Sequence, residues 1–324
     1  MKVLVTGGTG FVGSHIVRAL LASGHEVRLL ARSPSRVSLQ GVEVAEGEVT
    51  DATAVGKAVA GCDAVLHAAS VYSLQWKKHA EMRRVNVAGT RLVLEAGLAA
   101  GCNPVVHVSS LVALLGGTPR GGVISAESPV GNPMGVYAKT KRDSELVARE
   151  LQAKRHPVII TYPGSVWGPQ DPYLGESSVM ALQMARGFVP LTTTGGFSLV
   201  DVRDVAAVHA GLMHPHDGPK RYPALGRYVR HCDLQRMVCE AAGVRRLNLP
   251  LPTLLVMANL PFFQLLGAAG LHWANSAEGA YITWRDNRAD NGVSERELGV
   301  NFRPVQDTVR DTVTWLKAAG QLRL

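Results

Sequence analysis

The stretch M-K-V-L-V-T-G-G-T-G-F-V-G, Met1–Gly13, decides the fold. The apolar run Val3–Val5 has the composition of a buried strand, and a glycine-rich turn and a helical period at 12–22 follow it directly. A strand, a glycine turn and a helix in this order begin the βαβ unit that binds a dinucleotide, because only glycine lets the backbone approach a pyrophosphate this closely. We therefore expect cofactor contacts from Gly7, Thr9, Gly10, Phe11, Val12 and Gly13.

Outward from this stretch, short apolar runs alternate with helical periods through the first half of the chain. We expect strands at 3–5, 27–30, 42–44, 64–67, 105–108 and 158–160. Helices are expected at 12–22, 52–60, 79–100 and 136–154, with Gly24 and Gly101 as stop signals. This alternation predicts an α/β fold with a Rossmann-type, doubly wound parallel sheet.

Beyond Tyr162 the alternation loosens into helices and loops rich in proline and glycine. We assign residues 1–162 to a Rossmann domain, to which 198–230 returns. Residues 163–324 then form mainly a smaller, mostly helical substrate-binding lobe. Ligands of open α/β sheets bind outside the carboxyl ends of the strands, so we expect the substrate between the sheet and this lobe.

The composition is that of a globular protein, with 46% hydrophobic and 19% charged residues in 324. The net charge of +8 is scattered along the chain, which favours an anionic cofactor over nucleic acid. Four cysteines show neither metal-ligand spacing nor a paired framework, so we expect no metal and a reducing compartment. The first strand begins at Lys2 and leaves no room for a signal segment, which indicates a cytoplasmic location.

The uncharged stretch Leu249–Trp273 is long enough to be tested as a membrane span. Pro250, Pro252 and Pro261 interrupt it, so a broken pair of buried helices is favoured over a transmembrane segment. A peripheral contact with a membrane surface stays open.

The residues after the second expected strand indicate whether the cofactor carries a 2′-phosphate. An NAD site usually has a carboxylate there, about twenty residues after the glycine turn, whereas this chain has Ala31 and Arg32. Arg32, Ser33 and Arg36 can hold a 2′-phosphate by charge-assisted hydrogen bonds, so NADP(H) is preferred and NAD(H) is the second candidate. The alternative is that both arginines are solvated loop residues.

Tyr137 and Lys141 lie four residues apart near the start of an expected helix and therefore share one face. A free phenol has a pKa of about 10, and a neighbouring ammonium favours its phenolate, so the pair can transfer a proton near neutral pH. V-S-S at Val108–Ser110 ends the fifth strand and offers a hydroxyl to a carbonyl oxygen. Asn86 lies within the helix expected at 79–100, where it disrupts the backbone ladder.

With these motifs the sequence resembles the extended short-chain dehydrogenase/reductases, over nearly the whole chain. The motifs appear in the family's order: the glycine turn, H-A-A at His67–Ala69, Asn86, the serine pair, Tyr137 with Lys141, P-G-S-V-W-G-P at Pro163–Pro169, and V-D-V-R-D-V-A at Val200–Ala206. The resemblance implies Ser110, in preference to Ser109, as the active-site serine, Tyr137 as the acid/base and Lys141 as its partner, with Asn86 completing the catalytic set.

The resemblance also implies cofactor contacts beyond the glycine turn. The nicotinamide is expected at Pro163, Gly164, Ser165 and Val166, and further contacts at His67, Ala68, Ala69 and Lys141. The adenine is expected near Glu48 and Val49, where the family usually has aspartate in place of Glu48, so the longer side chain puts that contact in doubt. A homodimer through the helices bearing Asn86 and Tyr137 is implied as well.

The choice of reaction follows from residues after the active-site serine. Dehydratases of this family carry an Asp-Glu pair there, whereas this chain has Leu111–Leu114, which excludes elimination. The run G-G-F-S-L-V-D and the ending Trp315–Gly320 resemble the dihydroflavonol-reductase-like and 3β-hydroxysteroid-dehydrogenase-like branch. We expect an NAD(P)-dependent oxidoreductase acting on CH-OH or C=O groups of an apolar molecule, with a pocket formed by Tyr72, Trp76, Leu111, Leu115, Met134, Trp167 and Tyr173.

Two other functions stay open at this point. A sugar-nucleotide epimerase needs only the tyrosine, the lysine and a tightly held cofactor, together with cations that grip a diphosphate. A non-catalytic NADP-binding sensor would use the same fold but would usually lose the tyrosine or the lysine, both of which are present here.

Overall fold

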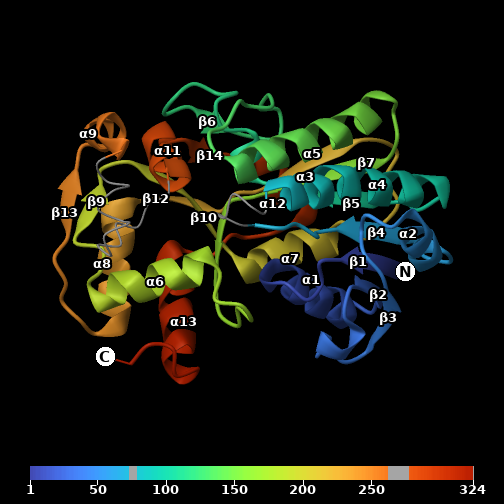
Figure 1. Cartoon of the computed structure of the whole chain (residues 1–324), viewed down its shortest axis with the longest axis horizontal. Helices are drawn as coiled ribbons and strands as arrows, with labels where there is room; N and C mark the ends of the chain where they lie inside the picture. Colours follow the sequence, from blue (N-terminus) through green and yellow to red (C-terminus); the bar gives the residue numbers. More distant parts are fainter. Residues whose placement is uncertain (73–78, 262–276, 324) are drawn as a thin grey trace.

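The computed structural model describes residues 1–72, 79–261 and 277–323. In this part of the chain, seven parallel strands form one sheet in the order β11-β7-β5-β4-β1-β2-β3 (Figure 1). β1 lies between β2 and β4. The chain adds β2 and β3 on one side of β1 and the remaining strands on the other side, so the glycine turn after β1 is at the topological switch point. The strands are β1 (Lys2–Thr6), β2 (Glu26–Ala31), β3 (Val42–Glu46), β4 (Ala64–His67), β5 (Val105–Val108), β7 (Val158–Pro163) and β11 (Lys220–Ala224).

Helices cover both faces of this sheet (Figure 1). One face packs on α1 (Phe11–Ala22) and α7 (Val202–Gly211), whose buried side chains form a core with β1, β2 and β5. The opposite face packs on α2 (Ala52–Val59), α4 (Thr90–Ala99) and α5 (Val136–Ala153). The doubly wound α/β architecture expected from the sequence is therefore confirmed.

The large sheet contains the expected strands with one addition, and one of the expected helices differs from its prediction. The added strand is the edge strand β11, whose sequence K-R-Y-P-A mixes charge and proline and lacks the apolar signal of a central strand. The expected helix at 79–100 is divided into α3 (His79–Arg83), a π-helical turn at Arg84–Gly89, and α4. This turn contains Asn86. The α-helical hydrogen-bond ladder is therefore interrupted at the residue that the sequence marked as disrupting it.

The second lobe has a core of its own, formed by α6 (Glu176–Arg186), α8 (His231–Ala242) and α13 (Val305–Ala318). A small sheet of β8 (Ser165–Trp167), β10 (Gly196–Asp201) and β12 (Arg227–Arg230) connects this core to the large sheet. The remaining elements are β6 (Val123–Ile124), β9 (Leu191–Thr193), β13 (Leu249–Leu251), α9 (Thr253–Ala258), α11 (Ala277–Arg285), β14 (Arg288–Ala289), α12 (Gly292–Leu298) and the short turns at Pro34–Arg36 and Leu111–Ala113.

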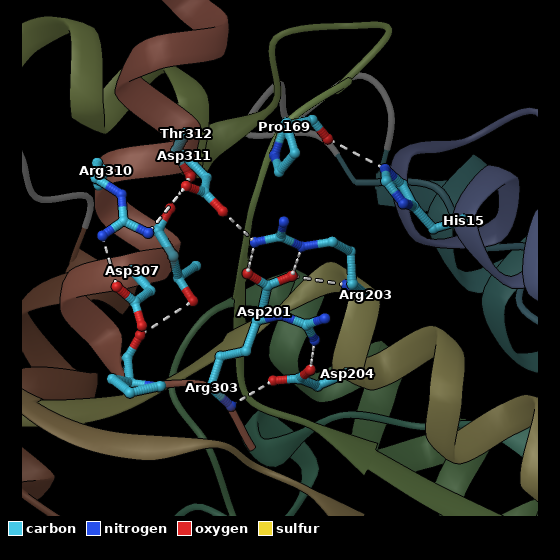
Figure 2. Close-up of polar contacts among 12 residues, drawn as sticks. His15, Pro169, Asp201, Arg203, Asp204, Arg303, Asp307, Arg310, Asp311 and Thr312 are labelled. Carbon is cyan, nitrogen blue, oxygen red and sulfur yellow. Dashed lines mark hydrogen bonds and ion pairs between the residues drawn. The ribbon is translucent and has the colours of Figure 1, made fainter. Parts of the chain in front are cut away.

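A cluster of ion pairs fastens β10 and α7 to α13 (Figure 2). Asp201 caps α7 by accepting from the amide of Arg203 at 2.8 Å, and it also accepts from that residue's guanidinium at 2.7 and 2.8 Å. Arg203 extends to Asp311 on α13 at 2.7 Å, and Arg303 pairs with Asp204 beside it. The segment V-D-V-R-D-V-A thus connects α7 to α13 in the second lobe.

The expectation of paired buried helices at Leu249–Trp273 is wrong for the described part of that stretch. It begins with β13, which pairs with β9, and continues into the short helix α9, whose Leu254 is 65% exposed. Pro250 and Pro252 prevent a helix from beginning earlier. Residues 262–273 lie outside the described residues. Among the helices that the structure describes, none combines the length and the apolarity needed to cross a bilayer.

Candidate active site

The glycine turn is packed too tightly for any side chain, which is the condition a dinucleotide site requires. A Cβ atom at Gly13 would lie 2.1 Å from the carbonyl oxygen of Gly7, and one at Gly7 would lie 2.6 Å from the amide nitrogen of Ala69. Gly7 also has φ +76°, which favours glycine. The first amides of α1, at Phe11 and Val12, have no partner within their own helix and face this turn. The residues present therefore fit the pyrophosphate of a dinucleotide.

A cavity of about 710 Å³ lies at the carboxyl edge of the sheet, between the glycine turn and the second lobe. It brings together residues that are far apart in the chain and that the sequence assigned to one site. Its lining includes Phe11, Val12, Ala68, Tyr72, Ser110, Leu111, Tyr137, Lys141, Pro163, Gly164, Ser165 and Val166.

Tyr137 and Lys141 occupy the first turns of α5 and both face the cavity. The Tyr137 ring meets the Tyr72 ring edge-on, with centroids 4.8 Å apart. The buried Lys141 donates from Nζ to the carbonyl oxygen of Val108 at 3.3 Å, which directs the ammonium toward the end of β5. Burial lowers the pKa of Lys141 to about 8, and the nearby charge of Glu145 opposes that shift.

Both serines at the end of β5 line the cavity. The oxygen of Ser110 accepts from the amide of Val112 at 3.4 Å, so its hydroxyl hydrogen is left to donate to a carbonyl oxygen. Ser109 is buried, and within the described residues its Oγ has no partner. The choice of Ser110 as the active-site serine stays a prediction.

A chain of hydrogen bonds connects the end of β1 to the π-helical turn. Thr6 donates to Nδ1 of His67 at 2.7 Å, and Nε2 of His67 donates to Thr90 at 3.0 Å. Thr90 donates in turn to the carbonyl oxygen of Asn86 at 2.7 Å. Its hydroxyl must therefore accept from His67, which sets the donor and acceptor of each hydrogen bond in the series. Burial lowers the pKa of His67 to about 3, so the ring is neutral as the chain requires. His67 is therefore a positioning residue between the glycine turn and the π-helical turn.

The side chain of Asn86 is fully engaged within the protein. Its Oδ1 accepts from the amide of Val71 at 2.7 Å, and its Nδ2 donates to the carbonyl oxygen of Val71 at 2.9 Å and to Thr140 at 3.0 Å. Thr140 then donates to the carbonyl oxygen of Tyr137 at 2.7 Å. Asn86 is not in the described cavity lining. Asn86 therefore helps to hold the first turn of α5, and its expected catalytic role stays a prediction.

A residue that the sequence analysis missed lies one turn beyond Lys141. Glu145 is fully buried, and its Oε1 accepts from Arg149 at 2.7 Å and from the Tyr162 hydroxyl at 2.7 Å. Within the described residues its Oε2 has no partner. The signal was present in the spacing, because positions 137, 141, 145 and 149 recur every four residues on one helix face.

The residues expected around the adenosine end lie on loops after β2 and β3. Arg32, Ser33 and Arg36 are all exposed, and within the described residues neither arginine forms an ion pair. Glu48 accepts from Arg84 at 3.5 Å. Val49 packs against Gly89, where a Cβ would lie 2.8 Å from the valine side chain, so it supports the π-helical turn.

Four residues expected in the substrate pocket are not in the described cavity lining, which is a correction. Leu115 and Trp167 are buried in two separate cores, because the chain turns inward after the active-site serine and β8 enters the second lobe. Met134 and Tyr173 are exposed, at 41% and 68%. Trp76 lies outside the described residues.

The second lobe supplies a cavity wall that the sequence analysis did not identify. Glu176, Val179, Met180 and Gln183 reach the cavity from α6, and Phe197 and Ile282 complete the wall. The spacing of 176, 179, 180 and 183 is that of one helix face, and this stripe after Gly175 was the available signal.

A Rossmann sheet whose glycine turn, serine, tyrosine and lysine meet at one cavity defines a nicotinamide-dependent oxidoreductase of the short-chain dehydrogenase/reductase type. Residues 3–222 match the NAD dependent epimerase/dehydratase family. The chain belongs to this family, and within it to the extended short-chain dehydrogenase/reductases. A nicotinamide cofactor follows from the family and from the fit of the glycine turn.

Three proteins illustrate the similarity. A protein of Synechocystis sp., provisionally named dihydroflavonol 4-reductase, is 29% identical over 98% of this chain and 95% of its own length. The 3 beta-hydroxysteroid dehydrogenase/Delta 5-->4-isomerase of Mycobacterium tuberculosis is 34% identical over 52% of this chain and 48% of its own length. The crystal structure of gox2253 is 30% identical, with a TM-score of 0.83, and the similarity covers 99% of both chains.

Proposed function

We propose that this chain is an NADP(H)-dependent oxidoreductase that reduces an apolar ketone or aldehyde, or oxidises the corresponding alcohol. The observation that carries the proposal is one cavity lined by the glycine turn, Ser110, Tyr137 and Lys141, and by the opposing wall, whose apolar members are Val179, Met180, Phe197 and Ile282. The names of the relatives, a reductase and a hydroxysteroid dehydrogenase, support the same class of reaction.

The side chains divide the reaction between them. A bound nicotinamide cofactor would supply a hydride to the carbonyl carbon. Ser110 donates a hydrogen bond to the carbonyl oxygen, and Tyr137 delivers the proton that this oxygen gains. The Lys141 ammonium stabilises the phenolate that Tyr137 becomes. Oxidation of the alcohol uses the same groups in reverse.

The preference for NADPH is supported by the charges after β2. Arg32 and Arg36 are exposed and follow β2, next to the glycine turn that would hold the pyrophosphate. Among the described residues, no carboxylate forms an ion pair with either arginine. A 2′-phosphate would pair with both guanidiniums and with the hydroxyl of Ser33. NADH lacks that phosphate and would leave both cations solvated.

The charges of the cavity count against a sugar nucleotide. In the part of the lining that the structure describes, Lys141 is the one cation, whereas Asp171 and Glu176 are acidic. A diphosphate would need additional cations, and Phe197 occupies the segment before V-D-V-R-D where epimerases commonly have a basic residue. An apolar carbonyl compound avoids this conflict.

Two expectations about the whole protein are proposals too. We propose a homodimer through α4 and α5, which lie side by side and are joined by the Arg91–Glu150 ion pair at 2.7 Å. We also propose a cytoplasmic location, since Cys62, Cys102, Cys232 and Cys239 are all free thiols.

Tyr137→Phe tests the proposed role of the tyrosine. The variant should lose at least about 100-fold in kcat, because general acid catalysis contributes roughly that factor or more. Its affinity for NADPH, measured by fluorescence titration, should stay within twofold of the parent protein because the glycine turn is untouched. Activity close to that of the parent protein would refute the assignment, and loss of NADPH binding would show that the variant acts through the fold.

A further inference from the structure

An exposed apolar surface at the end of the second lobe has no role in the reaction proposed above. We call it the leucine face, and its members are Phe188 (54% exposed), Leu247 (59%), Leu249 (47%), Leu254 (65%) and Leu255 (50%). Four of the five lie between residues 247 and 255 of the chain. β13 pairs with β9, and the amide of Leu249 donates to the carbonyl oxygen of Pro190 at 2.9 Å, which brings the β13 side next to Phe188.

The exposed leucines of α9 are not the residues that would form its buried side, because that side is already packed. Val256 and Thr253 are the buried residues of α9, and Val256 packs against Ala280 of α11. Leu254 and Leu255 therefore lie on the opposite, outer side of a helix whose inner side already has its core. Large contiguous apolar patches on a protein surface indicate a binding surface, because exposing them to water costs free energy.

The charges around the leucine face indicate what it binds. Arg245 and Arg246 directly precede Leu247, and both are exposed. Arg246 lies beside Gly187, and its Nε donates to the carbonyl oxygen of Ala185 at 2.9 Å, which holds it next to Phe188. No aspartate or glutamate occurs from Ala241 to Ala277, although the chain contains 26 of them. Arg245 and Arg246 thus border the apolar surface, and the acidic residue nearest to them in the sequence is Glu240 at the end of α8.

The leucine face is also placed where a flat partner can reach it. β13 and α9 lie at one end of the long axis of the molecule, and the N-terminus lies toward the other end (Figure 1). Within residues 1–72, 79–261 and 277–323, no larger element extends past them in this direction. Apolar side chains flanked by two arginines at an exposed end suit the interface of a bilayer, where leucines enter the acyl boundary and guanidiniums contact phosphates.

We propose that the leucine face docks this enzyme peripherally on an anionic phospholipid bilayer, with Arg245 and Arg246 contacting the lipid phosphates. The proposal rests on this surface alone and stands whether or not the substrate is apolar. It has a consequence for access, however. α11 carries Ala280 against α9 and Ile282 into the cavity lining, so the wall of the cavity lies just inside the docking surface.

Co-sedimentation of the full chain with vesicles is the test. The protein should sediment with vesicles that combine phosphatidylcholine and phosphatidylglycerol, and much less with phosphatidylcholine alone. Added salt should weaken the binding, since it screens the arginines. Absence of binding to the anionic vesicles, or equal binding to both kinds, overturns the proposal.

Paired variants locate the surface. Leu254→Gln with Leu255→Gln should weaken vesicle binding at least about tenfold, whereas Val44→Gln, on the edge strand β3 at the other end of the molecule, should not. Arg245→Gln with Arg246→Gln should weaken it by about 25-fold, at about fivefold per arginine near the surface. Arg18→Gln with Lys57→Gln changes the net charge equally at exposed positions elsewhere and should leave binding within twofold.

Folding and self-association are measured on the same variants. Each variant should keep the thermal midpoint and the NADPH affinity of the parent protein, because no substituted side chain is buried. Sedimentation velocity distinguishes a bilayer from a second copy of the chain. If Leu254→Gln with Leu255→Gln changes the oligomeric state and leaves vesicle binding intact, the leucine face is a protein interface and the proposal is wrong.

Discussion

The tyrosine and lysine proposed for proton transfer belong to a longer polar stripe along α5. Tyr137 and Lys141 face the cavity, while Glu145 and Arg149 continue the stripe into the protein interior. Burial lowers the pKa of Lys141 to about 8, and the carboxylate of Glu145 is the neighbour that opposes the shift. The charge of the lysine near neutral pH therefore depends on a buried acid outside the described cavity lining.

Glu145→Gln tests that dependence. In reduction, kcat/KM should fall as the pH rises through about 8, because Lys141 loses its proton and no longer stabilises the phenolate. Without the Glu145 carboxylate the pKa of Lys141 falls further, so this alkaline limb should move to lower pH. The matched comparison is the pH profile of the parent protein, measured with the same substrate and cofactor. An unshifted limb would contradict the coupling, even if activity fell.

The choice between NADPH and NADH is assigned to the two exposed arginines after β2. Arg32→Ala with Arg36→Ala should raise the KM for NADPH by roughly tenfold to 100-fold, because charge-assisted hydrogen bonds to the 2′-phosphate are lost. The KM for NADH should change by less than twofold. Lys57→Ala removes an exposed cation away from this loop and serves as the control. An equal rise for both cofactors would show that the arginines do not contact the 2′-phosphate.

The individual residues that the sequence could identify are those with fixed local spacing. Gly7 and Gly13 are fixed by the turn, and Tyr137 and Lys141 by one turn of helix, so each pair is legible without the rest of the fold. Leu115 and Trp167 were misplaced, because an apolar residue near a site can face the cavity or the core with equal ease. Only the packing of both lobes decides between these two environments.

The turn between β1 and α1 illustrates how one element depends on a single glycine. Gly13→Ala should abolish NADPH binding and lower the free energy of unfolding by more than about 2 kcal/mol, because the new Cβ would lie 2.1 Å from the carbonyl oxygen of Gly7. Gly56→Ala is the matched control in the interior of α2, where a Cβ meets nothing within 4 Å. It should raise the free energy of unfolding by about 0.5–1 kcal/mol. Calorimetry and NADPH titration measure both effects, and normal cofactor binding by Gly13→Ala would contradict the account.

The connection between α7 and α13 depends on a buried carboxylate. Burial raises the pKa of Asp201, but the hydrogen bonds and the charge of Arg203 outweigh it and leave the pKa below its ordinary value. The stabilisation from Asp201 is therefore present above the unfolded-state pKa of about 3.9 and is lost as the pH falls through the lower folded-state value.

Asp201→Asn should lower the free energy of unfolding by about 3 kcal/mol at neutral pH, as expected when a buried ion pair loses one partner. The difference from the parent protein should narrow as the pH falls below about 4. Asp311→Asn removes the partly exposed partner of the same arginine and should cost less than about 1 kcal/mol. Denaturant unfolding over a pH series measures both. Equal costs for the two variants would show that burial of Asp201 is not what matters.

The elements that escaped the sequence analysis did so for physical reasons. The π-helical turn at Arg84–Gly89 retains helical hydrophobic spacing, so residues 79–100 predict one continuous helix even though Asn86 marks the place of its irregularity. β11 is an edge strand and does not need the apolar residues that a central strand needs. β13 and α9 were mistaken for buried helices because their leucines are apolar, although they lie on the surface.

The two lobes together form the cavity, which neither lobe forms alone. The large sheet supplies the glycine turn and the proton-transfer residues, and α6 and α11 supply the opposing wall, with the Asp201 cluster holding the lobes together. The sequence predicted the first lobe well, since a parallel sheet imposes a regular alternation on the chain. It predicted the wall poorly, because the irregular second lobe has no such alternation. The homodimer stays a prediction.

The most direct test of the proposed reaction is NADPH oxidation by the purified protein with a panel of apolar ketones and aldehydes, including a 3-ketosteroid and a dihydroflavonol. The same panel is run with NADH and with a sugar nucleotide in place of the carbonyl compounds. We predict turnover of at least one apolar carbonyl compound, with NADPH preferred and with no conversion of the sugar nucleotide. Tight NADPH binding without turnover of any apolar carbonyl compound, or epimerisation of the sugar nucleotide, would contradict the proposed function.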